Sequence, residues 1–357
     1  MNTLTSTDPQ VLLDQMQSDM AGQPACYQPT EFWREASARI AAELRRDGFE
    51  NFRRQRDARS YFVPSYGPPG NMLTTDDVSR LEQLILQTTP CNSKKHLTLL
   101  SFIAGQAWAL ADYRVFRAGD RPGLKPDLSS VSESITGNPP DQVEFEGGRF
   151  SRSMLNYLHG LVFLKQTLPD ADIRTVLEIG GGFGTLGEIL HQAGGGYAYV
   201  DVDIPPTAAV ASYYLSQIPG LDLIDYSATR ELPTLAVPPA GSQMILCPWQ
   251  LPRLVGQVDL LWNFISFQEM EPATVQSYIA EAKRLGARYV LLRNLREGKQ
   301  RKGADSSVGV NEPILGADYD RFLTGYRLVA TNVFPFGHRT IDGFHSELRL
   351  YEKMPAR

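Results

Sequence analysis

The sequence predicts an α/β protein with a doubly wound, largely parallel sheet preceded by a helical region. Three observations support this fold class. Apolar runs alternate with helical stretches in the second half of the chain, a glycine cluster follows the first of these runs, and two β-like runs come last. The 357 residues suit one large α/β domain with an extension, or two domains.

Residues 1 to about 115 have the pattern of a helical region. Apolar side chains recur at helical spacing in Glu31–Leu44, Val78–Gln87 and Leu97–Phe116. The stretch Leu97–Leu110 is the most apolar of the chain, and we expect it to be a buried helix.

A connection rich in proline and glycine follows at residues 118–148. This composition is typical of an extended segment that passes from one packed unit to another. We therefore place a domain boundary near residue 130. It separates a helical N-terminal cap, residues 1–130, from an α/β domain, residues 131–357.

The α/β domain is predicted from alternating strands and helices, the pattern of βαβ units. The predicted strands are Thr175–Ile179, Tyr197–Val202, Gln243–Cys247, Val258–Phe264 and Arg288–Asn294. Between several of them lie the predicted helices Thr185–Gln192, Thr207–Ser216 and Ala273–Leu285. The last two β-like runs, Tyr326–Phe334 and Ser346–Tyr351, are too close for a crossover helix, so we expect an antiparallel hairpin at the sheet edge.

Charge and cysteine content narrow the class of partner. The net charge of -5 provides no general basic field for a nucleic acid or an anionic membrane, which favours a small-molecule substrate. The 3 cysteines are far apart and form no CxxC pair, so we expect neither a disulfide framework nor a metal site. Without a recognisable secretory signal or a long apolar run, a cytoplasmic location is expected, and a homo-oligomer remains open.

The glycine cluster is the strongest single feature of the sequence. Glu178, Gly180, Gly182 and Gly184 form a Glu-x-Gly-x-Gly-x-Gly turn between a predicted strand and a predicted helix. Glycines let backbone N–H groups approach a ligand closely. Gly182-x-Gly184-x-x-Gly187 also fits the dinucleotide fingerprint, so NAD(P) remains an alternative. A carboxylate at Glu178 repels a pyrophosphate but suits the cationic S-adenosylmethionine, which we expect as the cofactor.

Two carboxylates end the second predicted strand. Asp201 and Asp203 lie two residues apart, so their side chains are expected on the same face. We predict that Asp203 accepts hydrogen bonds from the ribose hydroxyls, and that Asp201 orients it or takes this role itself.

Several segments together resemble the bacterial sugar O-methyltransferase family: YQPTEFWREASARI, GFENFRR, SMLNYLHGLVFL, VLEIGGGFGTLGEIL, VDVDIPP and LLWNFISFQEM. The resemblance covers nearly the whole chain. It implies a Rossmann-like class I methyltransferase domain with a helical N-terminal cap. Similar sequences include azetidine-2-carboxylate synthases of natural-product clusters, in which the cofactor's own amine attacks its Cγ and expels methylthioadenosine. Methyl transfer to a hydroxyl of a sugar or natural-product intermediate is our first expectation, and this cyclisation is the alternative.

Methyl transfer to a hydroxyl requires alignment and an acceptor for the proton. Asn263 lies at the end of the fourth predicted strand and Glu269 follows it, where the reactive ligand is expected. Glu269 also fits a plain role at the start of a helix. His159, on the helix before the first strand, is a candidate base or a satisfied core histidine.

Cyclisation needs no external base but benefits from an aromatic ring near the sulfonium. Tyr157, Phe183 and Phe267 are the candidates, and each also fits ordinary core packing.

Overall fold

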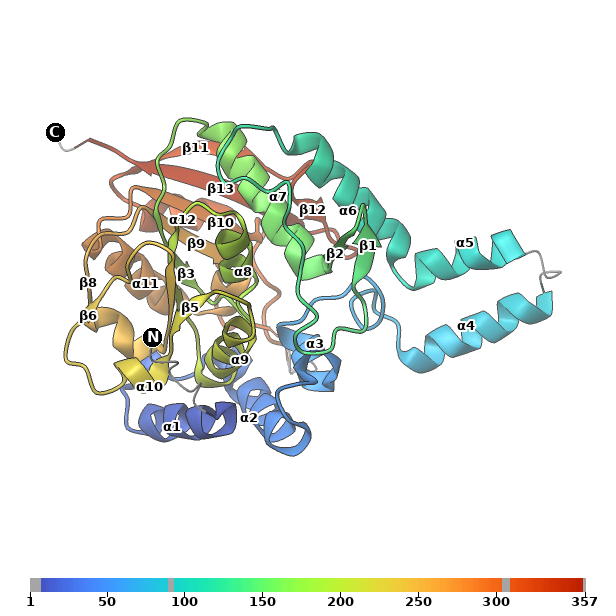
Figure 1. The fold of residues 1–357 in the computed structure, drawn as a ribbon, viewed down its shortest axis with the longest axis horizontal. Coiled ribbons are helices and arrows are strands. Elements are labelled where there is room, and N and C mark those ends of the chain that lie inside the picture. Colours follow the sequence, from blue (N-terminus) through green and yellow to red (C-terminus); the bar gives the residue numbers. More distant parts are fainter. Residues whose placement is uncertain (1–7, 89–92, 304–308, 356–357) are drawn as a thin grey trace.

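A computed structural model describes residues 8–88, 93–303 and 309–355. Within these residues, a central sheet of nine strands lies between two layers of helices (Figure 1). Its strand order is β11-β13-β10-β9-β3-β4-β7-β5, with β12 paired to β13. The strands are β3 (Thr175–Ile179), β4 (Ala198–Val202), β5 (Asp222–Ile224), β7 (Ser242–Leu246), β9 (Leu260–Phe264), β10 (Tyr289–Leu295), β11 (Tyr326–Asn332), β12 (His338–Arg339) and β13 (His345–Lys353).

The predicted α/β fold class is confirmed. Strands β10, β9, β3, β4 and β7 are parallel neighbours, and their bounds lie within two residues of the predicted ones. The predicted antiparallel hairpin is also present, formed by β11 and β13. Strand β13 additionally pairs antiparallel with β10, so β11 is the outermost strand. The short edge strand β5 was not predicted.

Successive side chains along the buried strands pack into two different apolar layers, one on each face of the sheet. Val176 and Trp262 pack with the helices of one face, whereas their neighbours Leu177 and Leu261 pack with the helices of the other face. Such alternation follows from the two-residue repeat of a strand. The helices are α7 (Arg152–Thr167), α8 (Thr185–Gln192) and α9 (Pro205–Ser216) on the first face, and α11 (Pro272–Arg284) and α12 (Gly316–Phe322) on the second.

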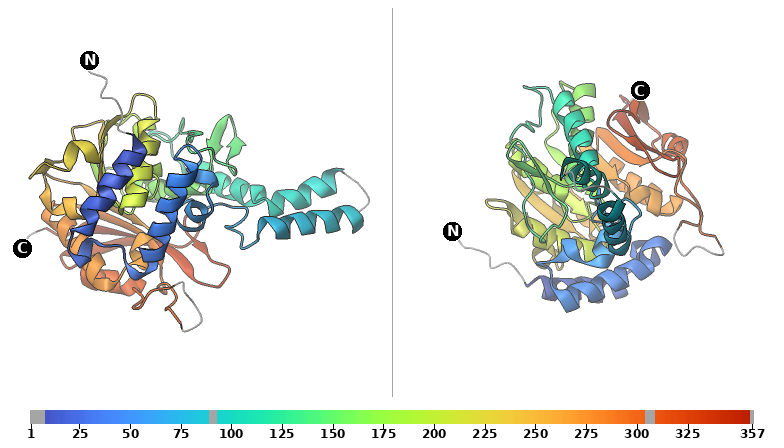
Figure 2. Two further views of the ribbon diagram at one scale, coloured as in Figure 1. Left: turned by 90° about the horizontal axis from the view of Figure 1, so that it is seen from below. Right: turned by 90° about the vertical axis from the view of Figure 1, so that its right-hand side faces the viewer.

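The N-terminal region packs against the first face. Helices α1 (Pro9–Ala21) and α2 (Glu31–Asp47) contact α9, and α3 (Arg56–Tyr61) follows them. Leu13 and Ile40 are fully buried in the same apolar cluster as the residues of α9. Figure 2 shows α1 and α2 side by side across this part of the molecule. The domain boundary near residue 130 stays a prediction.

The predicted helical pattern over Leu97–Phe116 is present, but the prediction of one buried helix over Leu97–Leu110 is wrong. The chain instead forms α5 (Ser93–Ile103) and α6 (Gln106–Gly119), separated at Gly105, whose φ is +83°. A Cβ at Gly105 would lie 2.4 Å from the backbone of Tyr66, so only glycine fits this turn. Leu97 is 64% exposed because α5 and α4 (Thr75–Thr88) form a hairpin that projects from the body (Figure 1).

The other short strands are β1 (Val143–Phe145), β2 (Gly148–Phe150), β6 (Leu235–Ala236) and β8 (Leu254–Val255), and α10 (Tyr226–Thr229) is a single helical turn. Strands β1 and β2 pair within the segment expected to be extended. Among the described helices, none is both long and apolar enough to cross a membrane. Cys26 and Cys247 are free thiols, and Cys91 lies outside the described residues.

Candidate functional site

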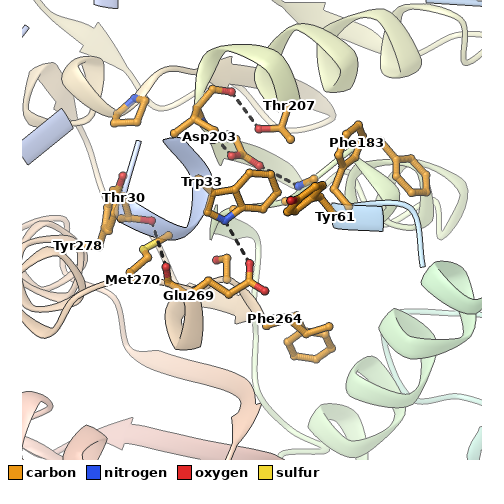
Figure 3. A pocket seen from close by; sticks show the side chains of 18 of the residues that line it. Thr30, Trp33, Tyr61, Phe183, Asp203, Thr207, Phe264, Glu269, Met270 and Tyr278 are labelled. Atoms are coloured by element: carbon orange, nitrogen blue, oxygen red, sulfur yellow. Dashed lines mark hydrogen bonds between the residues drawn. The ribbon is translucent and has the colours of Figure 1, made fainter. Parts of the chain in front are cut away.

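A cavity of about 160 Å³ lies at the carboxyl ends of β3, β4 and β9 (Figure 3). This is the place where ligands bind in open parallel sheets, because the strand order reverses there. The sheet contributes the glycine turn and the ends of β4 and β9, and the N-terminal region contributes the opposite wall. That wall contains Cys26, Tyr27, Gln28, Thr30, Trp33, Tyr61, Phe62 and Pro64.

The predicted glycine turn forms one side of the cavity. Gly180 and Gly182 line it with φ of +74° and +66°. A Cβ at Gly180 would lie 2.2 Å from Ser266 Oγ, whereas the nearest atom to a Cβ at Gly182 is 3.8 Å away. Gly182 thus leaves open space beside its backbone for a ligand. Gly184 does not line the cavity and precedes α8.

Asp203 lines the cavity at the end of β4. Its Oδ2 accepts a hydrogen bond from the N–H of Gly182 at 3.0 Å, and its Oδ1 accepts one from the N–H of Ile204 at 2.7 Å. Burial raises the pKa of Asp203 to about 6. Each carboxylate oxygen retains a lone pair, so this side chain can accept hydrogen bonds from two ligand hydroxyls.

Asp201 lies behind the glycine turn rather than in the cavity wall. Its Oδ1 accepts a hydrogen bond from the N–H of Gly181 at 3.0 Å. Its Oδ2 has no hydrogen-bond partner among the described residues. Burial, followed by the nearby Asp203 carboxylate, raises the pKa of Asp201 well above its usual value.

Glu178 is fully buried and does not line the cavity. It accepts hydrogen bonds from the hydroxyls of Tyr157 at 2.7 Å and Tyr199 at 2.6 Å. Burial raises the pKa of Glu178 to about 8. The carboxylate therefore positions Tyr157, whose ring does line the cavity, and its direct contact with a ligand stays a prediction.

Glu269 joins the two walls. Its Oε2 accepts a hydrogen bond from Trp33 Nε1 at 3.2 Å, and its backbone oxygen accepts one from Thr30 Oγ1 at 3.1 Å (Figure 3). Its Oε1 forms an ion pair with Lys299 Nζ at 2.6 Å. The same ammonium lies 3.8 Å from the ring centroid of Phe32. Glu269 thus connects the end of β9 with the start of α2 through direct contacts.

Asn263 and His159 lie outside the cavity wall. Asn263 is fully buried and donates hydrogen bonds to the backbone oxygen of Ile179 at 2.8 Å and to Ser266 Oγ at 2.6 Å. His159 Nε2 lies 2.8 Å from the backbone oxygen of Asp112, and burial lowers the pKa of the imidazole. Of the four proposed catalytic residues, the structure therefore brings only Tyr157 and Glu269 to the cavity. All four catalytic roles stay predictions.

Aromatic rings surround the cavity, and the sequence reasoning missed most of them. Phe183, one of the predicted rings, lines the cavity. Phe267, another predicted ring, does not line it, and Phe264 does so instead. The N-terminal wall adds Trp33 and Tyr61, whose ring centroids are 5.7 Å apart. The signal available in the sequence was the aromatic pair at the start of the helix Glu31–Leu44. Ring faces of this kind attract cations.

Ile265 is a second feature that the sequence did not indicate. It lines the cavity directly after β9 with φ of +72°, which is unfavourable for a β-branched residue. Its N–H donates to the backbone oxygen of Arg293 at 2.7 Å, which holds this turn in place. Strained residues of this kind concentrate at functional sites.

Comparisons with known proteins give fold-level likenesses at low identity. No known protein family matches the sequence, and no curated protein matches it. A glycopeptide N-methyltransferase complexed with S-adenosyl-L-methionine has 13% identity and a TM-score of 0.36 over 54% of this chain and 86% of its own. The magnesium protoporphyrin IX methyltransferase of Synechocystis PCC 6803 with bound SAH has 15% identity and a TM-score of 0.37, over 59% and 89%.

A third solved structure is phosphoethanolamine N-methyltransferase 1 of Haemonchus contortus, with 14% identity and a TM-score of 0.39 over 57% of this chain. The chain spans only 42% of that protein. The described chain itself has a Rossmann-like parallel sheet with an antiparallel C-terminal hairpin and a cavity at its switch point. Membership of the sugar O-methyltransferase family stays a prediction.

Proposed function

We propose that this chain is an S-adenosylmethionine-dependent transferase that methylates a hydroxyl of a small sugar or natural-product intermediate. One observation carries the proposal. The Asp203 carboxylate, the open turn at Gly182 and several aromatic rings face one cavity at the carboxyl ends of β3 and β4.

The cavity suits this cofactor better than a dinucleotide. Asp203 offers acceptors for two ribose hydroxyls, and Gly182 leaves space beside its backbone. The described lining residues include no lysine or arginine that would pair with a pyrophosphate. The rings of Tyr157, Phe183 and Phe264 instead suit a positively charged sulfonium.

The residues of the chain have separable roles in methyl transfer. When bound, S-adenosylmethionine supplies a methyl carbon that its sulfonium activates for in-line displacement. Asp203 orients the ribose, and Tyr157, held by Glu178, presents its ring to the positive charge. Trp33 covers the cavity and excludes water. Glu269 is the carboxylate at the end of β9 that accepts the hydroxyl proton of the acceptor.

Cyclisation of S-adenosylmethionine is the second candidate, and the lining favours it in one respect. Among the described lining residues there is no histidine, and both carboxylates, Asp203 and Glu269, already accept hydrogen bonds. An intramolecular reaction needs no acceptor base. In it the deprotonated α-amine forms a bond to Cγ, the Cγ–S bond breaks with its electrons on sulfur, and methylthioadenosine leaves. The α-ammonium first loses one proton to solvent, and the ring nitrogen of the product keeps the other two protons and the positive charge.

Mass spectrometry of the purified protein incubated with S-adenosylmethionine alone separates the two candidates. Enzyme-dependent methylthioadenosine with an equal amount of azetidine-2-carboxylate establishes the cyclase and overturns methyl transfer. Without turnover, hydroxylated acceptors are screened for S-adenosylhomocysteine release. Calorimetric titration with S-adenosylhomocysteine tests the site itself, and absence of binding overturns both candidates.

A further inference from the structure

The hairpin formed by α4 and α5 projects from the body of the protein (Figures 1 and 2). The two helices contact each other, but none of their described side chains is buried. Isolated helices of this length are marginal in water, since most helical stability in proteins comes from packing an apolar face. The hairpin therefore lacks, within the described chain, the packing that normally stabilises such helices.

Large apolar side chains are exposed along the described parts of α4 and α5 and at the base of the hairpin. The exposed fractions range from 37% at Leu81 to 64% at Leu97. We call the following residues the hairpin surface: Leu81, Leu86, Leu97, Leu99 and Phe102, with Trp108 at the base. Exposed apolar clusters of this kind mark interaction sites in soluble proteins.

Opposite charges lie at opposite ends of the hairpin. Asp76 and Asp77 occupy the first turn of α4, at the base, and Lys95 occupies the first turn of α5, at the tip. A helix of 14 residues is about 21 Å long, so the two ends cannot neutralise each other within one hairpin. A lysine in the first turn is unfavourable to the dipole of its own helix. Its charge is therefore better placed for a contact outside this helix.

We propose that a second copy of this chain covers the hairpin surface, with the two hairpins packed antiparallel as a four-helix bundle. A two-fold axis perpendicular to the hairpin places the tip of each hairpin beside the base of the other. Lys95 then lies beside Asp76 of the partner subunit, and the apolar side chains of both copies bury one another. Short antiparallel helices around an apolar centre are a common stable architecture.

The charge pattern favours a second copy over an anionic membrane. Helix α4 carries Asp76, Asp77 and Glu82 against Arg80, and α5 carries Lys94 and Lys95. The hairpin thus has both signs in equal number, whereas helices that bind anionic lipid carry an excess of cations on their polar face.

Light scattering coupled to size exclusion tests the proposal on the full chain. We expect twice the mass of one 39.7 kDa chain. Leu97→Glu with Phe102→Glu is expected to reduce this to one chain. Ile341→Glu, at a residue 91% exposed and outside the hairpin, is the matched control and keeps the dimer. Thermal unfolding confirms that both variants are folded.

A wild-type monomer at the highest soluble concentration overturns the proposal, as does a dimer that survives the double substitution. A monomer that sediments with vesicles of phosphatidylcholine and phosphatidylglycerol overturns it in favour of a membrane surface.

Charge exchange tests the antiparallel arrangement. Lys95→Glu and Asp76→Lys are each expected to raise the dimer dissociation constant about tenfold, because like charges then meet across the interface. The chain carrying both substitutions regains wild-type affinity. If the combined variant is weaker than either single variant, the antiparallel arrangement is wrong.

Discussion

The two walls of the cavity are held by different kinds of contact. On the sheet side, Gly182 and Asp203 are joined by the hydrogen bond from the Gly182 N–H to Asp203 Oδ2, at the ends of adjacent parallel strands. On the N-terminal side, Trp33 and Thr30 donate hydrogen bonds to Glu269, more than 200 residues away in the sequence. Strand register gives the first wall a defined geometry, whereas the second wall depends on packing and hydrogen bonds between segments that are distant in the sequence. We expect the sheet side to determine cofactor affinity and the N-terminal side to determine exchange rates.

The largest effect is expected on the sheet side, from Asp203→Ala. We expect at least about a tenfold loss of cofactor affinity, because a hydrogen bond to a charged group contributes about 1.5–3 kcal/mol. Calorimetric titration with S-adenosylhomocysteine measures it. Asp170→Ala, an exposed carboxylate far from the cavity, is the control. An unchanged dissociation constant would remove Asp203 from the site.

The pH dependence of binding probes the same wall. The pKa of Asp203 is raised to about 6, so the carboxylate is ionised above that pH and protonated below it. Protonation removes its charge, and the affinity for S-adenosylmethionine therefore falls as the pH falls through about 6. Asp203→Asn is expected to bind weakly at every pH in this range, with a flat profile. A profile in that variant as steep as in the wild type would assign the effect to another group.

A smaller effect is expected on the N-terminal side, from Trp33→Phe. This change keeps an aromatic ring but removes the hydrogen bond to Glu269, which is worth about 1 kcal/mol. We expect the dissociation rate of S-adenosylhomocysteine to rise about fivefold in stopped-flow measurements, with little change in the association rate. Trp108→Phe, at the base of the hairpin and outside the cavity wall, is the matched control. Equal rates in both variants would show that Trp33 does not control exchange.

The smallest effect on activity is expected from His159→Leu, because His159 lies outside both walls. The free energy of unfolding should fall by about 1–2 kcal/mol, since the backbone oxygen of Asp112 loses its buried partner. We expect kcat to change by less than about twofold. A drop of about a hundredfold in kcat, in a folded protein, would identify His159 as the base.

The sheet and half of the site were predictable because they depend on local sequence. The five parallel strands follow from apolar runs, and the positions of Gly182 and Asp203 follow directly from the strand ends. Asn263 shows the limit of this reasoning. A polar side chain at a strand end can face a ligand or can bind the neighbouring strand, and Asn263 does the latter.

The N-terminal wall could not be predicted, because its geometry comes from contacts between distant segments. In the sequence, Trp33 is only one apolar residue of a predicted amphipathic helix. The fold of the chain brings it into contact with Glu269. The exposed hairpin shows the opposite case, in which burial is predicted from the sequence but the structure shows exposure. The apolar stretch at Leu97–Leu110 predicted burial, but the described chain buries none of its residues in α5.

The contacts of α1 have a consequence for how the protein folds. Asp19 forms an ion pair with Arg230 at 3.0 Å and accepts a hydrogen bond from the hydroxyl of Tyr226 at 2.6 Å. These partners are separated by more than 200 residues, and closing loops of that length slows folding. The N-terminal wall meets Glu269 across a similar separation, so we expect the cavity to be completed late, after the parallel strands have paired. During synthesis the glycine turn emerges well before Glu269, so a nascent chain cannot close the ligand site from both sides.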